Sequence, residues 1–198
     1  MATVVVPFRG SDPKRRLDGL ADGDRVRLAG AMLEDVVDAA ATIAQVFVVS
    51  PEAQGLPADA VHVPDPRHGQ GAAAQAGLDA AVLAGAPAPY LIVNADLPCV
   101  TPRDLLALAG AVPEDGLALV PAADGTTNAL GLSSENLFEP LYGPGSAERF
   151  AALAPSRLVD APNIVDDVDT FADLDRLEDR LGASTRRVLA ALRREAAA

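Results

Sequence analysis

The chain has 198 residues, of which 49% are hydrophobic, and it carries a formal charge of −12. The hydrophobic fraction is enough for a packed core, whereas the negative charge argues against binding to nucleic-acid phosphates. A single cysteine excludes an intrachain disulfide and a multi-cysteine zinc site. The length predicts one domain over residues 1–198. The sequence shows neither a signal peptide nor a membrane-spanning run, so we expect a cytoplasmic protein that binds neither nucleic acid nor membrane.

Short apolar runs alternate with amphipathic segments along the chain. This alternation predicts an α/β fold with a mainly parallel sheet and helices on its faces. Ligands of such sheets bind outside the carboxyl ends of the strands. The predicted strands cover residues 3–6, 46–49, 61–63, 90–94, 117–121 and 129–132. The predicted helices cover residues 24–43, 71–83, 102–110, 146–153 and a final helix that starts at Thr170 and reaches the C-terminus.

A basic loop follows the first predicted strand. Arg9, Lys14, Arg15 and Arg16 place four cations within eight residues of an acidic protein. This local reversal of charge, together with backbone N–H groups near Gly10, points to a site for an anion such as a phosphate. The alternative is a solvated basic loop without a ligand. The GxxxxGK[ST] pattern of a P-loop is missing.

Two acidic segments carry the residue types that hold a divalent cation. Asp96 follows an apolar strand, on the ligand side of the predicted sheet. Asp167 and Asp169 belong to a run of three carboxylates, and in an extended segment they point to the same side, where they can face one Mg²⁺ ion. Asp166 would point the other way, toward solvent. The alternatives are an ordinary turn after the strand and a solvated acidic turn or helix cap.

Two segments that contain glycine offer hydroxyl and amide groups. Gly125 makes a turn shortly before Thr127 and Asn128, whose side chains could bind carboxylate or phosphate oxygens. Gly143 precedes Ser146, which is expected to cap a helix whose first N–H groups form an anion site. A hairpin turn and an ordinary N-cap are the respective alternatives.

The order of these segments resembles the CofC/FbiD family, the guanylyltransferases of coenzyme F420 biosynthesis. The resemblance extends roughly from residue 4 to residue 177 and rests on PKRRL, NADLP, GTTNALGL, YGPGS and DDVDTFADL. It implies a GT-A-type nucleotidyltransferase with a Rossmann-like sheet. It also implies that GTP condenses with a phosphorylated three-carbon acid and that pyrophosphate is released. The acid is phosphoenolpyruvate, 2-phospho-L-lactate or 3-phosphoglycerate. The Arg- and Ala-rich composition, typical of a GC-rich bacterium, favours phosphoenolpyruvate.

The resemblance also implies roles for individual residues. The carboxylates that bind Mg²⁺ and serve catalysis are Asp96, Asp167 and Asp169. The positions that hold the acid are Thr127, Gly143 and Ser146. In the basic loop, which the resemblance implies faces the phosphates of GTP, the matching cations are Lys14 and Arg16, and we expect Arg9 of the same loop to bind these phosphates too. Lys14 is also expected to act in catalysis by stabilising charge on the leaving pyrophosphate.

The residues leave other functions open. Another nucleotidyltransferase, such as a molybdenum-cofactor guanylyltransferase or a sugar-phosphate cytidylyltransferase, would share the fold. Such enzymes usually carry a glycine-rich first loop, and residues 7–17 lack that glycine density. A non-catalytic nucleotide-binding domain would not need so many carboxylates suited to a metal. The amphipathic C-terminal segment packs either on its own domain or on a second subunit, so a homodimer also stays open.

Overall fold

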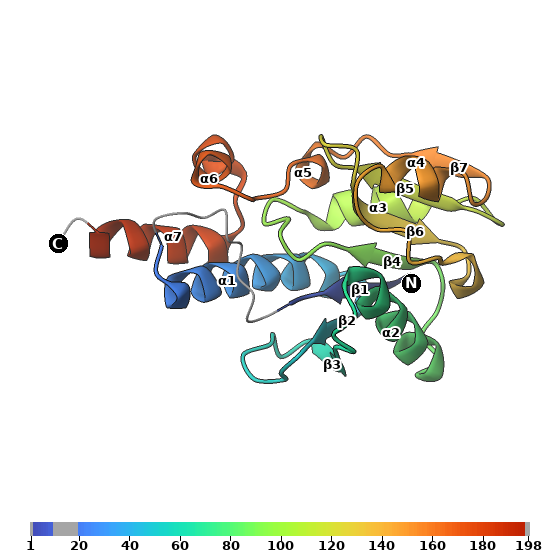
Figure 1. The fold of residues 1–198 in the computed structure, drawn as a ribbon, viewed down its shortest axis with the longest axis horizontal. Coiled ribbons are helices and arrows are strands. Elements are labelled where there is room, and N and C mark those ends of the chain that lie inside the picture. Colours follow the sequence, from blue (N-terminus) through green and yellow to red (C-terminus); the bar gives the residue numbers. More distant parts are fainter. Residues whose placement is uncertain (1, 10–19, 197–198) are drawn as a thin grey trace.

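The computed structural model describes residues 2–9 and 20–196. Seven strands form one sheet that lies between layers of helices (Figure 1). The strands are β1 (Ala2–Pro7), β2 (Ala44–Ser50), β3 (Ala60–Pro64), β4 (Tyr90–Val93), β5 (Leu117–Pro121), β6 (Thr127–Leu132) and β7 (Ser156–Leu158). Their order across the sheet is β3-β2-β1-β4-β6-β5-β7. The helices are α1 (Asp22–Ala41), α2 (Gln70–Leu83), α3 (Pro102–Ala111), α4 (Ser146–Ala151), α5 (Pro162–Val165), α6 (Phe171–Arg176) and α7 (Ala183–Ala196).

The sheet is mixed, and β6 is the strand that runs against its neighbours. The pairs β1–β2, β1–β4, β2–β3 and β5–β7 are parallel, whereas β6 pairs antiparallel with β4 and β5. The reversal comes from a hairpin, in which Asp124 Oδ1 accepts a hydrogen bond from the backbone N–H of Thr126 (2.9 Å). Gly125 in this turn has a φ of 82°, a conformation that glycine adopts without strain. The predicted α/β fold with a mainly parallel sheet is confirmed.

Successive residues of the strands face opposite layers of helices, as the pleat of a strand requires. Val4 and Val6 pack on the side of α1, α3 and α5. Val5 packs on the side of α2 and α4. Gly77 allows α2 to approach the sheet closely, because a Cβ atom there would lie 2.3 Å from Cγ1 of Val5. The central strands are therefore buried on both faces, which is why they read as unbroken apolar runs in the sequence.

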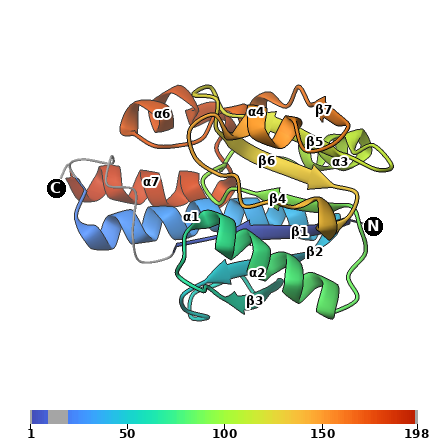
Figure 2. The same cartoon turned by 45° about the vertical axis from the view of Figure 1, so that its right-hand side comes forward.

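A third apolar cluster joins α1, α6 and α7 to the loop after β4. Helix α7 lies along α1 in both views of the molecule (Figures 1 and 2). Asp35 of α1 is 7% exposed, and it accepts hydrogen bonds from the backbone N–H groups of Ser184 (2.8 Å) and Thr185 (2.9 Å) at the start of α7. The C-terminal helix thus packs on its own chain, while the question of a homodimer stays a prediction.

The prediction of one continuous final helix is wrong. Helix α6 does begin after Thr170, whose Oγ1 accepts a hydrogen bond from the N–H of Asp173 in a capping box. The chain then leaves the helix, and Gly182 donates its N–H to the C=O of Pro98 (2.7 Å) before α7 starts. Strand β7 and helix α5 were not predicted, because each is short and lacks a clear apolar period. Over the described ranges, the helices lack the length and apolar run that crossing a bilayer requires.

Candidate active site

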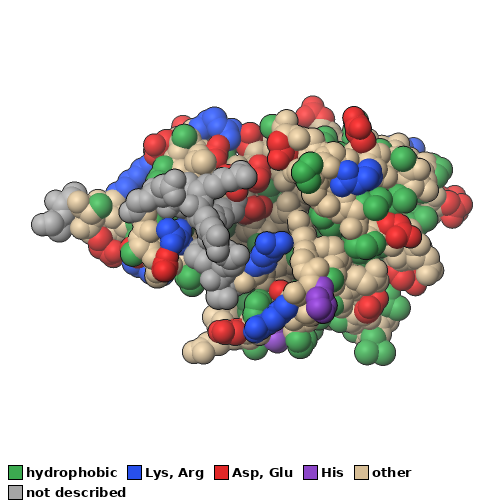
Figure 3. All heavy atoms as spheres, in the orientation of Figure 1, with side chains coloured by type: hydrophobic (Ala, Val, Ile, Leu, Met, Phe, Trp, Pro, Cys, Tyr) green, Lys and Arg blue, Asp and Glu red, His purple; other side chains and the backbone are tan. Residues whose placement is uncertain are grey.

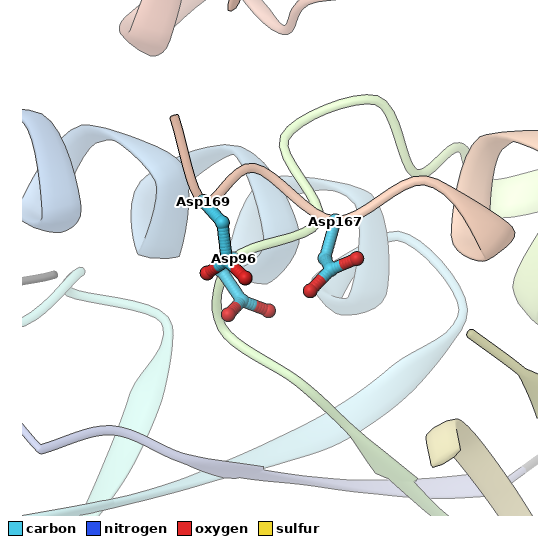
Figure 4. Close-up of side chains that lie close together, drawn as sticks. All are labelled: Asp96, Asp167 and Asp169. Atoms are coloured by element: carbon cyan, nitrogen blue, oxygen red, sulfur yellow. The ribbon is translucent and has the colours of Figure 1, made fainter. Parts of the chain in front are cut away.

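Three carboxylates from distant parts of the sequence meet beyond the carboxyl end of β4 (Figure 4). Asp96 follows β4, whereas Asp167 and Asp169 lie between α5 and α6. Each residue has a carboxylate oxygen within 4.8 Å of those of the other two, and all three are half-buried. Figure 4 shows Asp167 and Asp169 on the same side of their segment, facing Asp96. The structure therefore brings together the three residues that the sequence predicted as one set. We call Asp96, Asp167 and Asp169 the carboxylate group.

Val168 explains the orientation of the two aspartates beside it. Its side chain is fully buried in the third apolar cluster, and its N–H donates to the C=O of Asp96 (3.1 Å). Successive side chains of an extended segment point to opposite sides, so burial of Val168 turns Asp167 and Asp169 to the other side. One apolar residue thus joins this segment to the loop after β4 and aims both carboxylates.

Asp166 stays out of the carboxylate group, as predicted, and it is partly exposed, but it also has charged partners that were not expected. Its two oxygens bind the guanidinium groups of Arg176 and Arg180, each at 2.7 Å, and its side chain is 26% exposed. Burial alone would raise the pKa of Asp166, but the hydrogen bonds and charges of Arg180 and Arg176 hold it below its ordinary value. The sequence did not show this ion pair, because both arginines lie beyond the acidic run.

We expect the ion pairs of Asp166 to lose their contribution to stability in acid. Because the folded pKa is lowered, the contribution is complete above the unfolded value of about 4 and fades as the pH falls through the folded pKa. Asp166→Asn should lower the free energy of unfolding by about 1 kcal/mol or less at pH 7, since the arginines are partly exposed. Urea unfolding of both proteins at pH 7, 5 and 3 measures this difference, and a difference that does not shrink at pH 3 would contradict it.

The reversed direction of β6 brings its first residues to the same edge of the sheet. The backbone N–H of Asn94, which directly follows β4, donates to the C=O of Asn128 in β6 (3.0 Å). Asn94 Nδ2 also lies 3.3 Å from the C=O of Thr127. Because β6 runs antiparallel to β4, its start meets the carboxyl end of β4, where Asp96 follows. Thr127 is thereby placed on the carboxylate side of the sheet.

Thr127 and Ser146 lie side by side, and Gly143 is bonded to Ser146. The two hydroxyl oxygens are 3.1 Å apart, and both side chains are buried, at 2% and 0% exposure. A helix begins at Ser146, as predicted, and ends at Ala151, but its N-cap is Gly145, so the prediction that Ser146 caps it is wrong. The N–H of Ser146 donates to the C=O of Gly143 (3.0 Å). Binding of the acid by Thr127, Gly143 and Ser146 stays a prediction.

A chain of amide side chains runs beside the carboxylates. Gln70 Nε2 donates to Asn94 Oδ1 (2.7 Å), and Asn94 Nδ2 donates to Asn128 Oδ1 (3.3 Å). Asn128 Nδ2 in turn donates to the C=O groups of Ile164 (2.8 Å) and Val165 (3.1 Å). From the sequence, Asn128 was expected to bind oxygen atoms of a ligand. In the structure its amide binds backbone carbonyls instead, which no local pattern could have shown.

The predicted nucleotide-binding cations are only partly described. Arg9 is exposed two residues after β1, at the same edge of the sheet as the end of β4, because these two strands are parallel. Lys14 and Arg16 lie outside the described residues. Figure 3 shows acidic and basic side chains together in the middle of one face of the molecule. Nucleotide binding by these cations stays a prediction.

The carboxylate group is chemically suited to a small divalent cation. Mg²⁺ prefers oxygen ligands at about 2.1 Å, so oxygens on opposite sides of the ion lie about 4.2 Å apart. The oxygens of Asp96, Asp167 and Asp169 lie within 4.8 Å of one another, close enough for small side-chain rotations to complete such a set. Mg²⁺ commonly combines one or two protein carboxylates with substrate phosphates. The three aspartates could therefore hold a metal.

Comparisons with known proteins place this chain in a family. The model of the MobA-like NTP transferase domain matches residues 25–194. The phosphoenolpyruvate guanylyltransferase of Sphaerobacter thermophilus is 36% identical, over 89% of this chain and 93% of the relative. The phosphoenolpyruvate guanylyltransferase of Nocardia farcinica is also 36% identical, over 95% of this chain and 89% of the relative. The 2-phospho-L-lactate guanylyltransferase of Natrialba magadii is 34% identical, over 86% of this chain and 80% of the relative.

Solved structures show the same fold at low sequence identity. A candidate nucleotide-diphospho-sugar transferase of Desulfovibrio desulfuricans superposes with a TM-score of 0.74, at 16% identity over 96% of this chain and 95% of the other. The 2-C-methyl-D-erythritol 4-phosphate cytidylyltransferase of Thermus thermophilus superposes with a TM-score of 0.55, at 20% identity over 90% of this chain and 97% of the other. The chain belongs to the MobA-like NTP transferase family and, within it, to the CofC/FbiD family of phosphoenolpyruvate and 2-phospho-L-lactate guanylyltransferases.

Proposed function

We propose that this chain condenses GTP with phosphoenolpyruvate and releases pyrophosphate, as a step of coenzyme F420 biosynthesis. The main support for the proposal is the carboxylate group beyond β4. It occurs in a chain that is 36% identical to each of two phosphoenolpyruvate guanylyltransferases. The choice of acid is supported by these two names, while a 2-phospho-L-lactate enzyme at 34% identity makes that acid the nearest competitor.

The chemistry requires positioning and charge neutralisation more than proton transfer. An oxygen of the acid's phosphate forms a bond to the α-phosphorus of GTP, and the bond from that phosphorus to the β-phosphate oxygen breaks, so pyrophosphate leaves. A phosphate monoester is already anionic at neutral pH, so this step needs no general base. The obstacle is the repulsion between two negatively charged reactants. The site must therefore hold both phosphates in line and screen their charge.

The chain's own residues divide this work. Asp96, Asp167 and Asp169 would hold Mg²⁺, which when bound supplies the positive charge that lets the two phosphates approach. Arg9 and the cations of the basic loop, Lys14 and Arg16, would bind the phosphates of GTP. The acid would be oriented by Thr127, Gly143 and Ser146. The position of Thr127 on the carboxylate side of the sheet supports this division.

The proposal is tested by an assay with GTP, Mg²⁺ and each of the three acids in turn. We expect kcat/KM for phosphoenolpyruvate to exceed those for 2-phospho-L-lactate and 3-phosphoglycerate by about tenfold or more, which corresponds to about 1.4 kcal/mol of transition-state discrimination. Pyrophosphate release measures the rate, and mass spectrometry identifies the guanosine diphospho-linked acid. Reactions with CTP or ATP, and with GTP alone, are the controls. Absence of such a product with all three acids would refute the proposed reaction.

A further inference from the structure

The two segments that carry the metal-binding aspartates are tied together by one buried side chain in β6. Asn128 is 2% exposed. Its Nδ2 group donates to the C=O groups of Ile164 (2.8 Å) and Val165 (3.1 Å), so both of its amide hydrogens are used. Val165 lies two residues before Asp167, which places this contact directly upstream of two of the three carboxylates.

The other end of the same amide reaches the segment that carries Asp96. Asn128 Oδ1 accepts a hydrogen bond from Asn94 Nδ2 (3.3 Å), and the C=O of Asn128 accepts one from the N–H of Asn94 (3.0 Å). Asn94 lies two residues before Asp96. Asn128, in β6, therefore contacts both the segment that leads to Asp96 and the segment that leads to Asp167.

The spacing between the carboxylates depends on this link because Asn128 binds both the chain just before Asp167 and Asn94, two residues before Asp96. Helix α5 has only four residues, and the segment beyond it is joined to the loop after β4 by the bond from Val168 N–H to Asp96 C=O. The bonds of Asn128 and Val168, one on each side of Asp167, together with the ion pairs of Asp166, hold the segment in place relative to Asp96. Without Asn128, Val168 and the ion pairs of Asp166 still hold the segment, but its bond to β6 is lost and Asp167 can move relative to Asp96.

We infer that Asn128 is a positioning residue that sets the distance between Asp96 and the Asp167–Asp169 pair, and so tunes the affinity of the site for a divalent cation. The inference rests on the metal site of the proposed function. Side chains that orient metal ligands from behind typically change metal affinity by about 10- to 100-fold when they are removed. Asn128 does not touch the ion or the reacting atoms in this role; it acts through the backbone that bears the ligands.

The test measures binding of Mn²⁺, as a paramagnetic probe in place of Mg²⁺, to the full chain by electron paramagnetic resonance without substrates. Asn128→Ala should raise the Kd for Mn²⁺ about 10- to 100-fold. In turnover assays, the Mg²⁺ concentration needed for half-maximal rate should rise by a similar factor, and excess Mg²⁺ should restore most of kcat. A residue that serves stability alone would lower the melting temperature and leave the Kd of the folded protein unchanged.

Asn163→Ala is the matched control. Asn163 lies on α5, beside the residues whose carbonyls Asn128 binds, but its amide binds the side chains of Asp104 (3.1 Å) and Arg180 (3.3 Å) and does not link the two carboxylate segments. Its Kd should stay at the wild-type value. Where Asn128→Ala fails to fold, Asn94→Ala replaces it, since Asn94 is half-buried and supplies the bond to Asn128 Oδ1. We expect an increase of about tenfold, the lower end of the same range.

Asp96→Ala separates failure of this inference from failure of the proposed function. If Asp96→Ala loses Mn²⁺ binding while Asn128→Ala and Asn94→Ala bind it like the wild type, the metal site stands and the positioning role is overturned. If Asp96→Ala itself binds Mn²⁺ like the wild type, the metal site of the proposed function is wrong and the inference falls with it. Weaker binding in both Asp96→Ala and Asn128→Ala, with unchanged binding in Asn163→Ala, supports the positioning role.

Discussion

Asp96→Ala is expected to lower kcat by at least about 100-fold, the usual effect of removing one electrostatic contact from a transition state. The carboxylate lies within 4.8 Å of those of Asp167 and Asp169, and its loss leaves two ligands from a single segment. The protein should stay folded, because the apolar clusters of the sheet do not include this side chain. Steady-state rates of pyrophosphate release and far-UV circular dichroism measure the two effects.

The matched control for this prediction is Asp160→Ala. Asp160 is an exposed carboxylate shortly before α5, and it is not part of the carboxylate group. Its removal changes the net charge by the same amount and should leave kcat unchanged. Mg²⁺ should raise the melting temperature of the wild type and of Asp160→Ala by mass action, but not that of Asp96→Ala. Full activity of Asp96→Ala would refute the assignment of this residue to the metal.

Asp35→Ala is expected to destabilise the fold by about 2–3 kcal/mol. The buried carboxylate accepts the N–H groups of Ser184 (2.8 Å) and Thr185 (2.9 Å), and its removal leaves two donors at the start of α7 without this acceptor. It also removes a negative charge from the positive end of the helix dipole. The melting temperature should fall by about 5–10 °C in a chain of this size, as measured by differential scanning calorimetry.

Two further variants test the same contact. Asp38→Ala removes a neighbouring, exposed carboxylate of α1. Partial loss of water around its carboxylate, and the charges of Glu34 and Asp35, raise the pKa of Asp38, so its charge is slightly unfavourable in the fold, and this variant should be neutral or slightly stabilising. Gly182→Ala places a Cβ atom 2.2 Å from Cγ of Asp35 and should reproduce most of the loss. Equal melting temperatures for Asp35→Ala and Asp38→Ala would contradict the cap.

Local patterns predicted most of the elements because each depends on residues close in sequence. The apolar run at the start of the chain became β1, and α3 and α6 begin where predicted, after Thr101 and Thr170, each of which forms a capping box with an aspartate three residues on. The common orientation of Asp167 and Asp169 likewise follows from the two-residue period of an extended segment. The prediction of the final helix was wrong because the chain leaves the helix after Arg176, and Gly182 binds the distant carbonyl of Pro98 before α7 begins.

The candidate site likewise combines features that local patterns predict with features that depend on distant contacts. The sequence by itself determined which side chains carry negative charge, that two of them share one side of their segment, and that Asp96 follows a buried strand of an α/β sheet. Only the tertiary structure decided that Asp166 would bind two arginines, that Ser146 would be buried against Thr127, and that the Asn128 amide would link the two carboxylate segments. These outcomes depend on pairs of residues between 10 and 37 positions apart. The free energy of such a contact is determined by burial and by partners that the packed sheet supplies, and neither is encoded in the neighbouring residues.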